Sequence, residues 1–228
     1  MSSTTSTPRT PASGRPPVSL TERRKAETRM DIARAAARLF ARHGLRATRA
    51  EDIARTAGIA PRTFYRYFAT KEEAVAPLYA LGAGRWIEAV REAPAALTPP
   101  QALERAVRHT LTPGAGMSAA SWEGARTLIR LAGSSPALRK VWADVCHTTE
   151  RALAEALAER ARGARAAEGG GDVAGPRLRF AAATAGVAVR VAMEHWAASA
   201  DEPARALELA LVNLEVLREF AWGEALGE

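Results

Sequence analysis

The sequence has one cysteine, Cys146, and four histidines in 228 residues. A single cysteine excludes an internal disulfide, and these residues do not cluster at the spacings of a metal site, so no metal ligands are expected. No stretch approaches the roughly 18 charge-free apolar residues that a membrane span needs. The opening residues, MSSTTSTPRTPASGRPP, also lack the apolar segment of a secretion signal. We therefore expect a cytoplasmic protein with no membrane partner.

Aromatic residues are scarce, at 6% of the chain, and β-branched residues are sparse as well. Alanine, the strongest helix former, occurs 53 times, while hydrophobic residues make up 47% of the sequence, enough for a substantial core. Apolar residues recur at helical spacing throughout, and nothing alternates as a strand would. The composition and the periodicity predict an all-α fold.

Positive charge is concentrated at the start of the chain. Residues 1–76 contain 15 Lys and Arg against 7 Asp and Glu, whereas the remaining residues contain 17 against 18. A basic first third followed by a near-neutral body rich in alanine and leucine indicates a segment that meets a polyanion and a segment with another task. The alternative is a basic solvated surface that has no partner.

Turn residues divide the chain into helices. Residues 1–18 are rich in Ser, Thr and Pro and read as a flexible basic tail, while the glycine-rich residues 163–175 read as a flexible connection. Pro77 should kink the helix that opens at Thr70. A short second helix follows the capping box at Thr48 and is ended by Gly58, and a fourth helix opens at Thr70. The other expected helices span residues 20–42, 62–68, 98–111, 118–132, 136–162, 176–199 and 203–222.

Two of the short expected helices have the pattern of a helix-turn-helix unit. The run Thr48-Arg49-Ala50-Glu51 has the spacing of a capping box, Gly58 lies in the turn, and Pro61 occupies the first position of the next helix. In such a unit the second helix enters the major groove of DNA. Phe64 and Phe68, four residues apart, are expected to face the core.

Polar residues of this unit are candidates for contacts with DNA. Side chains that donate hydrogen bonds suit base edges, whereas tyrosine hydroxyls, cations and a helix N-terminus suit phosphates. The expected base-facing donors are Arg62, Thr63 and Arg66, and the expected phosphate contacts are Thr48, Arg49, Tyr65, Tyr67 and Lys71.

The run AEDIARTAGIAPRTFYRYFATKEEAV, residues 50–75, resembles the DNA-binding signature of the tetracycline-repressor (TetR) family of bacterial transcriptional regulators, and ARAAARLFARHG, residues 33–44, resembles its first helix. The resemblance covers roughly residues 24–79. It implies a homodimer of all-helical subunits, each with an N-terminal DNA-binding domain and a C-terminal domain that dimerises and binds an effector. It also places base contacts at Arg62, Thr63 and Tyr67, and phosphate contacts at Thr48, Tyr65 and Lys71. Ala60, where many members have Ser, and Tyr67, often His, depart from the pattern.

All five tryptophans lie beyond the expected DNA-binding unit. Because pockets between helices are commonly lined by aromatic and soft side chains, we expect an apolar cavity bounded by Trp122, Trp142, Cys146 and Met193, with the cation of Arg126 at its mouth. Residues 131–145, LAGSSPALRKVWADV, resemble actinobacterial relatives that respond to acyl-thioesters. The expected effector is therefore mostly hydrophobic, with an acyl-thioester as the specific candidate.

The last two expected helices are apolar on more than one side and need cover from a second subunit. Packing them across a two-fold axis as a four-helix bundle provides that cover and makes the chain a homodimer. The residues expected at this dimer interface are Leu178, Val189, Trp196, Leu207, Leu211 and Leu214.

No arrangement of residues suggests an enzyme. Cys146 and its neighbour His147 point about 100° apart on a helix and cannot act as a nucleophile and its base, and the glycine runs lack the residues of a phosphate loop. We therefore expect no cofactor and no catalytic residue. The expected organisation is a tail (1–18), a helix-turn-helix domain (19–70) and an effector and dimerisation domain (71–228).

These observations favour a ligand-responsive repressor that leaves a palindromic double-stranded operator when its effector shifts the helix kinked at Pro77. A second interpretation, from another class, is a helical small-molecule-binding or carrier protein whose basic domain is incidental.

Overall fold

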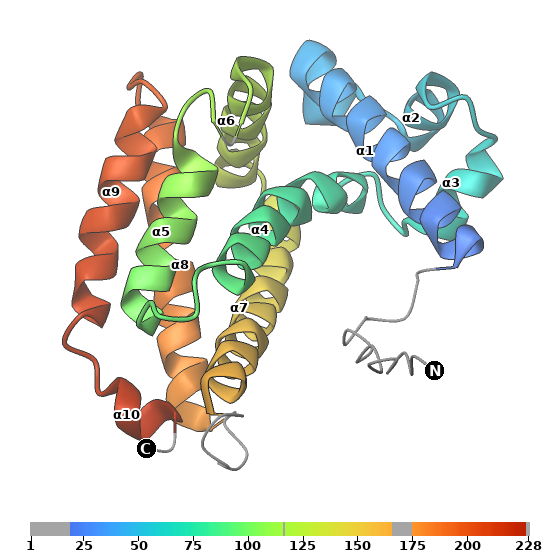
Figure 1. Ribbon diagram of the computed structural model, residues 1–228. Coiled ribbons are helices and arrows are strands. Elements are labelled where there is room, and N and C mark those ends of the chain that lie inside the picture. Colours follow the sequence, from blue (N-terminus) through green and yellow to red (C-terminus); the bar gives the residue numbers. More distant parts are fainter. Residues whose placement is uncertain (1–18, 116, 166–174, 227–228) are drawn as a thin grey trace, which may run out of the picture.

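The computed structural model describes residues 19–115, 117–165 and 175–226, and in these ranges every regular element is a helix (Figure 1). The predicted tail and most of the predicted connection lie outside the described residues. The all-α prediction is confirmed. The α-helices are α1 (Leu20–Ala47), α2 (Ala50–Thr56), α3 (Pro61–Tyr67), α4 (Ala76–Arg91), α5 (Pro99–Leu111), α6 (Ala119–Ser134), α7 (Pro136–Arg165), α8 (Pro176–Ala198), α9 (Ala204–Leu214) and α10 (Trp222–Leu226), and short 3-10 helices η1 (Glu73–Val75) and η2 (Glu215–Leu217) precede α4 and follow α9.

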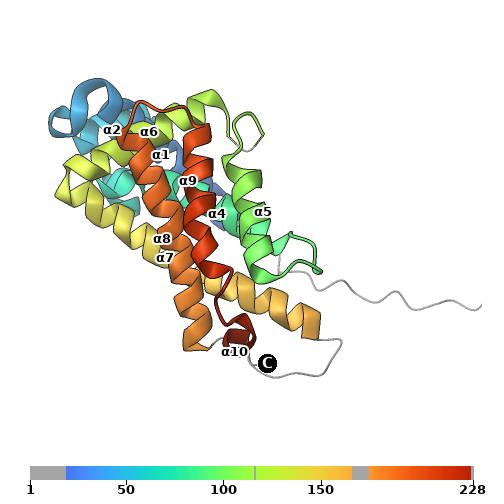
Figure 2. The same cartoon turned by 90° about the vertical axis from the view of Figure 1, so that its left-hand side faces the viewer.

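The helices form two groups, which α4 connects (Figure 1). Helices α1 to α3 lie together on one side, and helices α5 to α10 pack with α4 on the other. Figure 2 shows α8 and α9 lying side by side along the outer face of the second group. None of the described helices is long and apolar enough to cross a membrane.

Two apolar clusters hold the chain together. The larger one fills the space between α4, α5, α7, α8 and α9. The other joins Ile32, Phe40 and Phe64 of the first three helices to Tyr79 of α4 and Leu128 of α6. The second cluster therefore crosses the predicted boundary at residue 70, and α4 and α6 are packed directly against α1.

The prediction that Pro77 kinks a helix is wrong. The capping interaction at Thr70 is present, since its Oγ1 accepts a hydrogen bond from Glu73 N at 3.2 Å. The chain then makes the short 3-10 turn η1, and α4 begins at Ala76, which places Pro77 in the first turn. A proline is tolerated there because the first turn requires no intrahelical N–H donor.

Three expected boundaries also differ. Gly44 adopts a left-handed backbone (φ 77°), but the chain resumes one further helical turn and α1 is counted to Ala47. Helix α7 continues through Gly163 to Arg165. The single helix expected over residues 203–222 is three pieces, α9, η2 and α10. Apolar spacing locates helices, but it does not register a change from α to 3-10 geometry.

Candidate functional site

Helices α2 and α3 form the predicted helix-turn-helix unit. Gly58 supplies the left-handed residue of the turn (φ 70°), and Ile59 N donates to Ala54 O at 3.0 Å. Pro61 begins α3, whose N-cap, Ala60, offers no side-chain hydrogen bond. Phe64 is fully buried and fixes α3 against the first two helices. This packing determines which face of α3 is turned outward.

The outward face of α3 carries the predicted base-facing donors. Arg62, Tyr65 and Arg66 are exposed, and Thr63 and Tyr67 are half-buried. The Tyr65 hydroxyl donates to Glu51 Oε1 at 3.3 Å, which links α3 to α2. All five predicted residues therefore lie on one short helix, where Arg62 is exposed and the Arg66 guanidinium lies over the Tyr67 ring, 5.5 Å from its centroid.

Thr48 requires a correction. Its side chain is only 2% exposed, and its hydroxyl donates to Gly44 O at 2.9 Å, so it closes the end of α1 and does not face a phosphate. The N-cap of α2 is Arg49, one residue later than predicted, and its backbone N–H donates to Asp52 Oδ2 at 3.3 Å. Arg49 itself is exposed. A cation thus remains at the start of α2 where a phosphate contact was predicted.

Lys71 is half-buried and already engaged. Its ammonium group donates to Leu45 O at 2.7 Å and to Thr48 O at 2.8 Å, which ties the segment between α3 and η1 to the end of α1 and the start of α2. This geometry favours a positional role: Lys71 holds the N-terminal end of α2 in place. The predicted phosphate contact remains untested.

An apolar cavity of about 350 Å³ lies among helices α4 to α8 and reaches α1 of the first group at Ala37. Trp142, Cys146 and Met193 line it, as predicted, and so does Ala37 of α1. The remaining walls come from α4, α5, α6, α7 and α8, including Leu78, Tyr79, Leu81, Trp86, Leu111, Met117, Leu128, Ile129, Val145, Thr149, Val189 and Arg190. A compound held in this cavity would lie against α1 of the first group, at Ala37, and against the second group of helices.

Two residues predicted for the cavity do not line it. Trp122 is 3% exposed and packs edge-on against Trp196, with ring centroids 4.9 Å apart. Arg126 lies over the Trp196 ring at 4.4 Å and donates to the backbone oxygen of Asp201. Their closeness on α6 follows from i, i+4 spacing, but that face of α6 packs against α8 and the segment before α9. The cations that line the cavity are Arg85 and Arg190.

Tyr79 and Trp86 line the cavity although the sequence reading assigned them no site. They are seven residues apart on α4, two helical turns, and so share a face. Burial raises the pKa of the Tyr79 hydroxyl well above its usual value, and burial also raises the pKa of the Cys146 thiol to about 12. Both groups are therefore uncharged at neutral pH, which keeps the cavity apolar.

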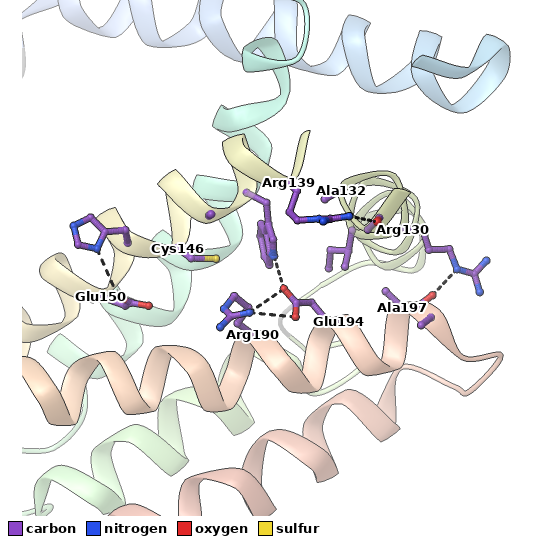
Figure 3. A pocket seen from close by; sticks show the side chains of 14 residues that line it. Arg130, Ala132, Arg139, Cys146, Glu150, Arg190, Glu194 and Ala197 are labelled. Atoms are coloured by element: carbon purple, nitrogen blue, oxygen red, sulfur yellow. Dashed lines mark hydrogen bonds and ion pairs between the residues drawn. The ribbon is translucent and has the colours of Figure 1, made fainter. Parts of the chain in front are cut away.

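A second, polar cavity of about 730 Å³ adjoins the first (Figure 3). Both share Ile129, Trp142, Cys146 and Arg190 as walls. Trp142 Nε1 donates to Glu194 Oε1 at 2.7 Å, and Arg190 lies 3.2 Å from both oxygens of the same carboxylate. This hydrogen-bonded group stands where the two cavities meet, and sequence spacing gave no sign of it because Trp142 and Glu194 are 52 residues apart.

Most of the residues predicted for the dimer interface are packed against the core of their own subunit. Leu178, Trp196 and Leu214 are 2% exposed or less and belong to the subunit's own core, so these three cannot supply an interface. Val189 lines the apolar cavity, and Leu207 and Leu211 pack partly against the same core. The large apolar side chains exposed on α8, α9 and η2 are Phe180, Val187, Val191, Val212 and Val216.

Comparison with known proteins identifies the family. Residues 32–76 match the model of bacterial regulatory proteins of the tetR family. The chain is 31% identical over 220 residues to the HTH-type transcriptional regulator TcmR of Streptomyces glaucescens, covering 95% of this chain and 91% of that protein.

Solved structures agree on the fold. A structure named as a TetR-family transcriptional regulator from Rhodococcus sp. superposes with a TM-score of 0.55 at 18% identity, covering 84% of this chain and 98% of that one. The TetR-family repressor FadR of Thermus thermophilus, solved with lauroyl-CoA, gives a TM-score of 0.51 at 24% identity over 85% and 94% of the two chains. These relatives are transcriptional regulators and not enzymes. The chain thus belongs to the TetR family of bacterial regulatory proteins and is a DNA-binding transcriptional regulator.

Proposed function

We propose that the chain is a homodimeric repressor that binds a palindromic operator and is released from it by a small, mostly hydrophobic effector. The observation that carries this proposal is the apolar cavity, whose wall includes Ala37 of α1 as well as residues of α4 to α8. An effector there contacts the DNA-binding unit and the remaining helices together. It can therefore favour one of their relative positions, as ligand control of DNA binding requires.

The proposed DNA contacts lie on α3 and at the start of α2. Arg62, Thr63 and Arg66 would reach base edges, while Tyr65, Tyr67 and the exposed cation of Arg49 would contact phosphates. Residues 19–70 would form the DNA-binding domain and residues 71–228 the effector and dimerisation domain. The apolar cluster that contains both Phe64 and Tyr79 packs the two proposed domains against each other.

The proposed dimer uses the exposed apolar faces of α8, α9 and η2. Phe180, Val187 and Val191 on one helix and Val212 and Val216 on the next are 40–67% exposed. Pairing these faces across a two-fold axis removes them from water and gives a four-helix bundle. The two α3 helices would then lie about one DNA turn apart, roughly 34 Å.

The apolar lining supports a hydrophobic effector. An acyl-thioester, suggested by residues 131–145, remains the specific candidate, and Trp142 and Val145 of that region line the cavity. The effector would act by moving α4 at its junction with η1, since no kink at Pro77 is present to serve as a hinge.

The proposal is tested by selecting fragments of genomic DNA with the purified full-length protein. We expect enrichment of a two-fold symmetric sequence whose half-sites are about 10 base pairs apart, bound by an even number of chains. Fluorescence anisotropy on the recovered fragment and on a scrambled copy then gives the specificity. Enrichment of no sequence, or of an asymmetric site bound by one chain, would contradict the proposed repressor.

A further inference from the structure

The two adjoining cavities differ in chemistry. The apolar cavity is lined largely by aliphatic, aromatic and thioether side chains, among them Leu78, Trp86 and Met193. The polar cavity is lined by Arg130, Arg139, His147, Glu150, Arg190 and Glu194. Because Arg190 lines both cavities, a compound whose apolar body lies in the apolar cavity can place a polar end at Arg190.

Positive charge exceeds negative charge around the polar cavity. Three arginines face two glutamates, and Glu150 lies 3.8 Å from His147 Nδ1. Arg139 donates to Gly133 O at 2.8 Å, and Arg130 donates to the backbone oxygen of Ala197 (Figure 3). Arg130 also donates to the backbone oxygen of Ser199 at 2.9 Å. Backbone carbonyls hold these guanidinium groups in position, but they do not cancel their charge. The cavity therefore favours an anion.

Glu194 occupies the place that such an anion would take. Its carboxylate accepts hydrogen bonds from the Trp142 indole and from the Arg190 guanidinium, one donor from α7 and one from α8. The pair Arg190–Glu194 is about one-third exposed on each side and has i, i+4 spacing, a class of ion pair that contributes little to stability. An incoming anion can displace the carboxylate into solvent at low cost.

We propose that this site binds an amphipathic anion, whose apolar body fills the apolar cavity and whose anionic group replaces the Glu194 carboxylate on Arg190. The Glu194 carboxylate then competes with the ligand's anionic group for Arg190 and lowers the affinity for the ligand. This inference rests on the proposed function, because it names the chemical class of the effector. It leaves the source of the anionic group, a carboxylate, sulfonate or phosphate, to the experiment.

The test uses two fluorescent probes of matched shape, 1-anilinonaphthalene-8-sulfonate and N-phenyl-1-naphthylamine, which differ by one sulfonate. Each is titrated into wild type, Glu194→Gln, Arg190→Gln and Arg190→Lys, with circular dichroism to verify the fold. We expect Glu194→Gln to bind the sulfonate more tightly, by about tenfold, because Arg190 loses its internal carboxylate. Arg190→Gln should bind it about tenfold more weakly, and Arg190→Lys should recover most of the loss. The neutral probe should change by less than about twofold in all three variants, because it places no charge at Arg190.

Parallel changes of both probes in any variant, or weaker sulfonate binding in Glu194→Gln, would overturn the proposal. So would displacement of the neutral probe by decylammonium in preference to decanoate, since Glu194 would then be holding a cation. The titrations contain no DNA, and their outcome is therefore independent of whether an occupied cavity alters operator affinity. Decanoate, octyl sulfonate and octyl phosphate, compared as competitors, distinguish the anionic groups.

Discussion

The rings of Tyr79 and Trp142 lie in contact, with centroids 4.8 Å apart, where α4 crosses α7. Trp142 lines both cavities, and the Tyr79 hydroxyl donates to Leu128 O of α6 at 2.8 Å. Tyr79 also belongs to the apolar cluster that contains Ile32 and Phe64 of the DNA-binding unit. If a ligand displaces Trp142, we expect the movement to reach α4, which connects to the DNA-binding unit.

Replacing Gly124 with leucine should close part of the apolar cavity. Gly124 lines that cavity on α6, and a Cβ added there meets no atom within 4 Å. A glycine within a helix costs roughly 0.5–1 kcal/mol relative to alanine, so we expect Gly124→Leu to raise the melting temperature while weakening N-phenyl-1-naphthylamine binding severalfold.

The matched control is Gly163→Leu on α7. Its Cβ also meets open space, but Gly163 lines neither cavity. This variant should be stabilised similarly and bind the probe as wild type does. Equal probe affinity in the two variants would show that the probe binds elsewhere.

The stability of the protein should fall above about pH 9 in part because of Cys146. Burial raises the pKa of its thiol from 9.0 to about 12, so the folded chain holds the proton over a range in which the unfolded chain releases it. This contribution is fully present below pH 9 and is lost as the pH rises toward 12. Urea unfolding at pH 8 and pH 10 should show a smaller loss for Cys146→Ala than for wild type. The pKa of Tyr79 is raised chiefly by burial, which both proteins share; the smaller contribution from Cys146 is lost in the variant and acts in the same direction as the thiol's own loss.

An identical pH dependence of the two proteins would mean that the thiol is more hydrated than its position in the cavity wall indicates.

We expect Lys71 to stabilise the fold of the DNA-binding unit and not to contribute its charge to DNA binding. Lys71→Met removes two charged hydrogen bonds to the carbonyls of Leu45 and Thr48, for an expected loss of about 1–3 kcal/mol in unfolding free energy. Binding to specific and random DNA should weaken alike, with the dependence on salt unchanged. Arg49→Ala, at an exposed cation, should instead reduce the salt slope by about one unit. If Lys71→Met also reduced the dependence of DNA binding on salt, the result would support a contact between Lys71 and a phosphate.

Much of this architecture follows from sequence pattern, because helix stops such as Gly58 and N-terminal prolines such as Pro61 act locally. Local signals do not decide between two neighbouring residues that could both be the N-cap of a helix. Thr48 and Arg49 both precede α2, and the hydroxyl of Thr48 is taken by Gly44 O, which leaves Arg49 as the N-cap. Pro77 was read as a kink because sequence does not reveal where a 3-10 turn gives way to an α-helix.

Long-range packing limited the prediction of sites. Helix α8 is apolar nearly all round, and periodicity alone could not decide which side faces the subunit's own core. The structure buries Leu178 and Trp196 and exposes Phe180 and Val187. The pairing of Trp142 with Glu194 across two helices likewise depends on how α7 meets α8, which no local pattern encodes.

Charge on the exposed face of α9 should dissociate the proposed dimer. Val212 is 62% exposed, so Val212→Glu is tolerated in one subunit but places a carboxylate in the apolar interface. We expect a monomer by analytical ultracentrifugation, with an unchanged helical spectrum and weaker operator binding. Leu214 is unsuitable for this test, because it is buried in its own subunit and a charge there would unfold the chain.

Ala137→Glu, at an exposed position of α7, serves as the control and should leave the oligomeric state as in wild type. Sedimentation of Val212→Glu at the wild-type value would place the interface elsewhere.

The central claim, sequence-specific binding of DNA through α3, is tested most directly by titrating the selected operator and a random duplex with wild type and Arg62→Ala. Arg62 is exposed on α3. If its guanidinium reads a base edge, the variant loses about 1–3 kcal/mol of binding free energy on the operator and much less on the random duplex. Equal losses on the two duplexes would contradict base reading by α3.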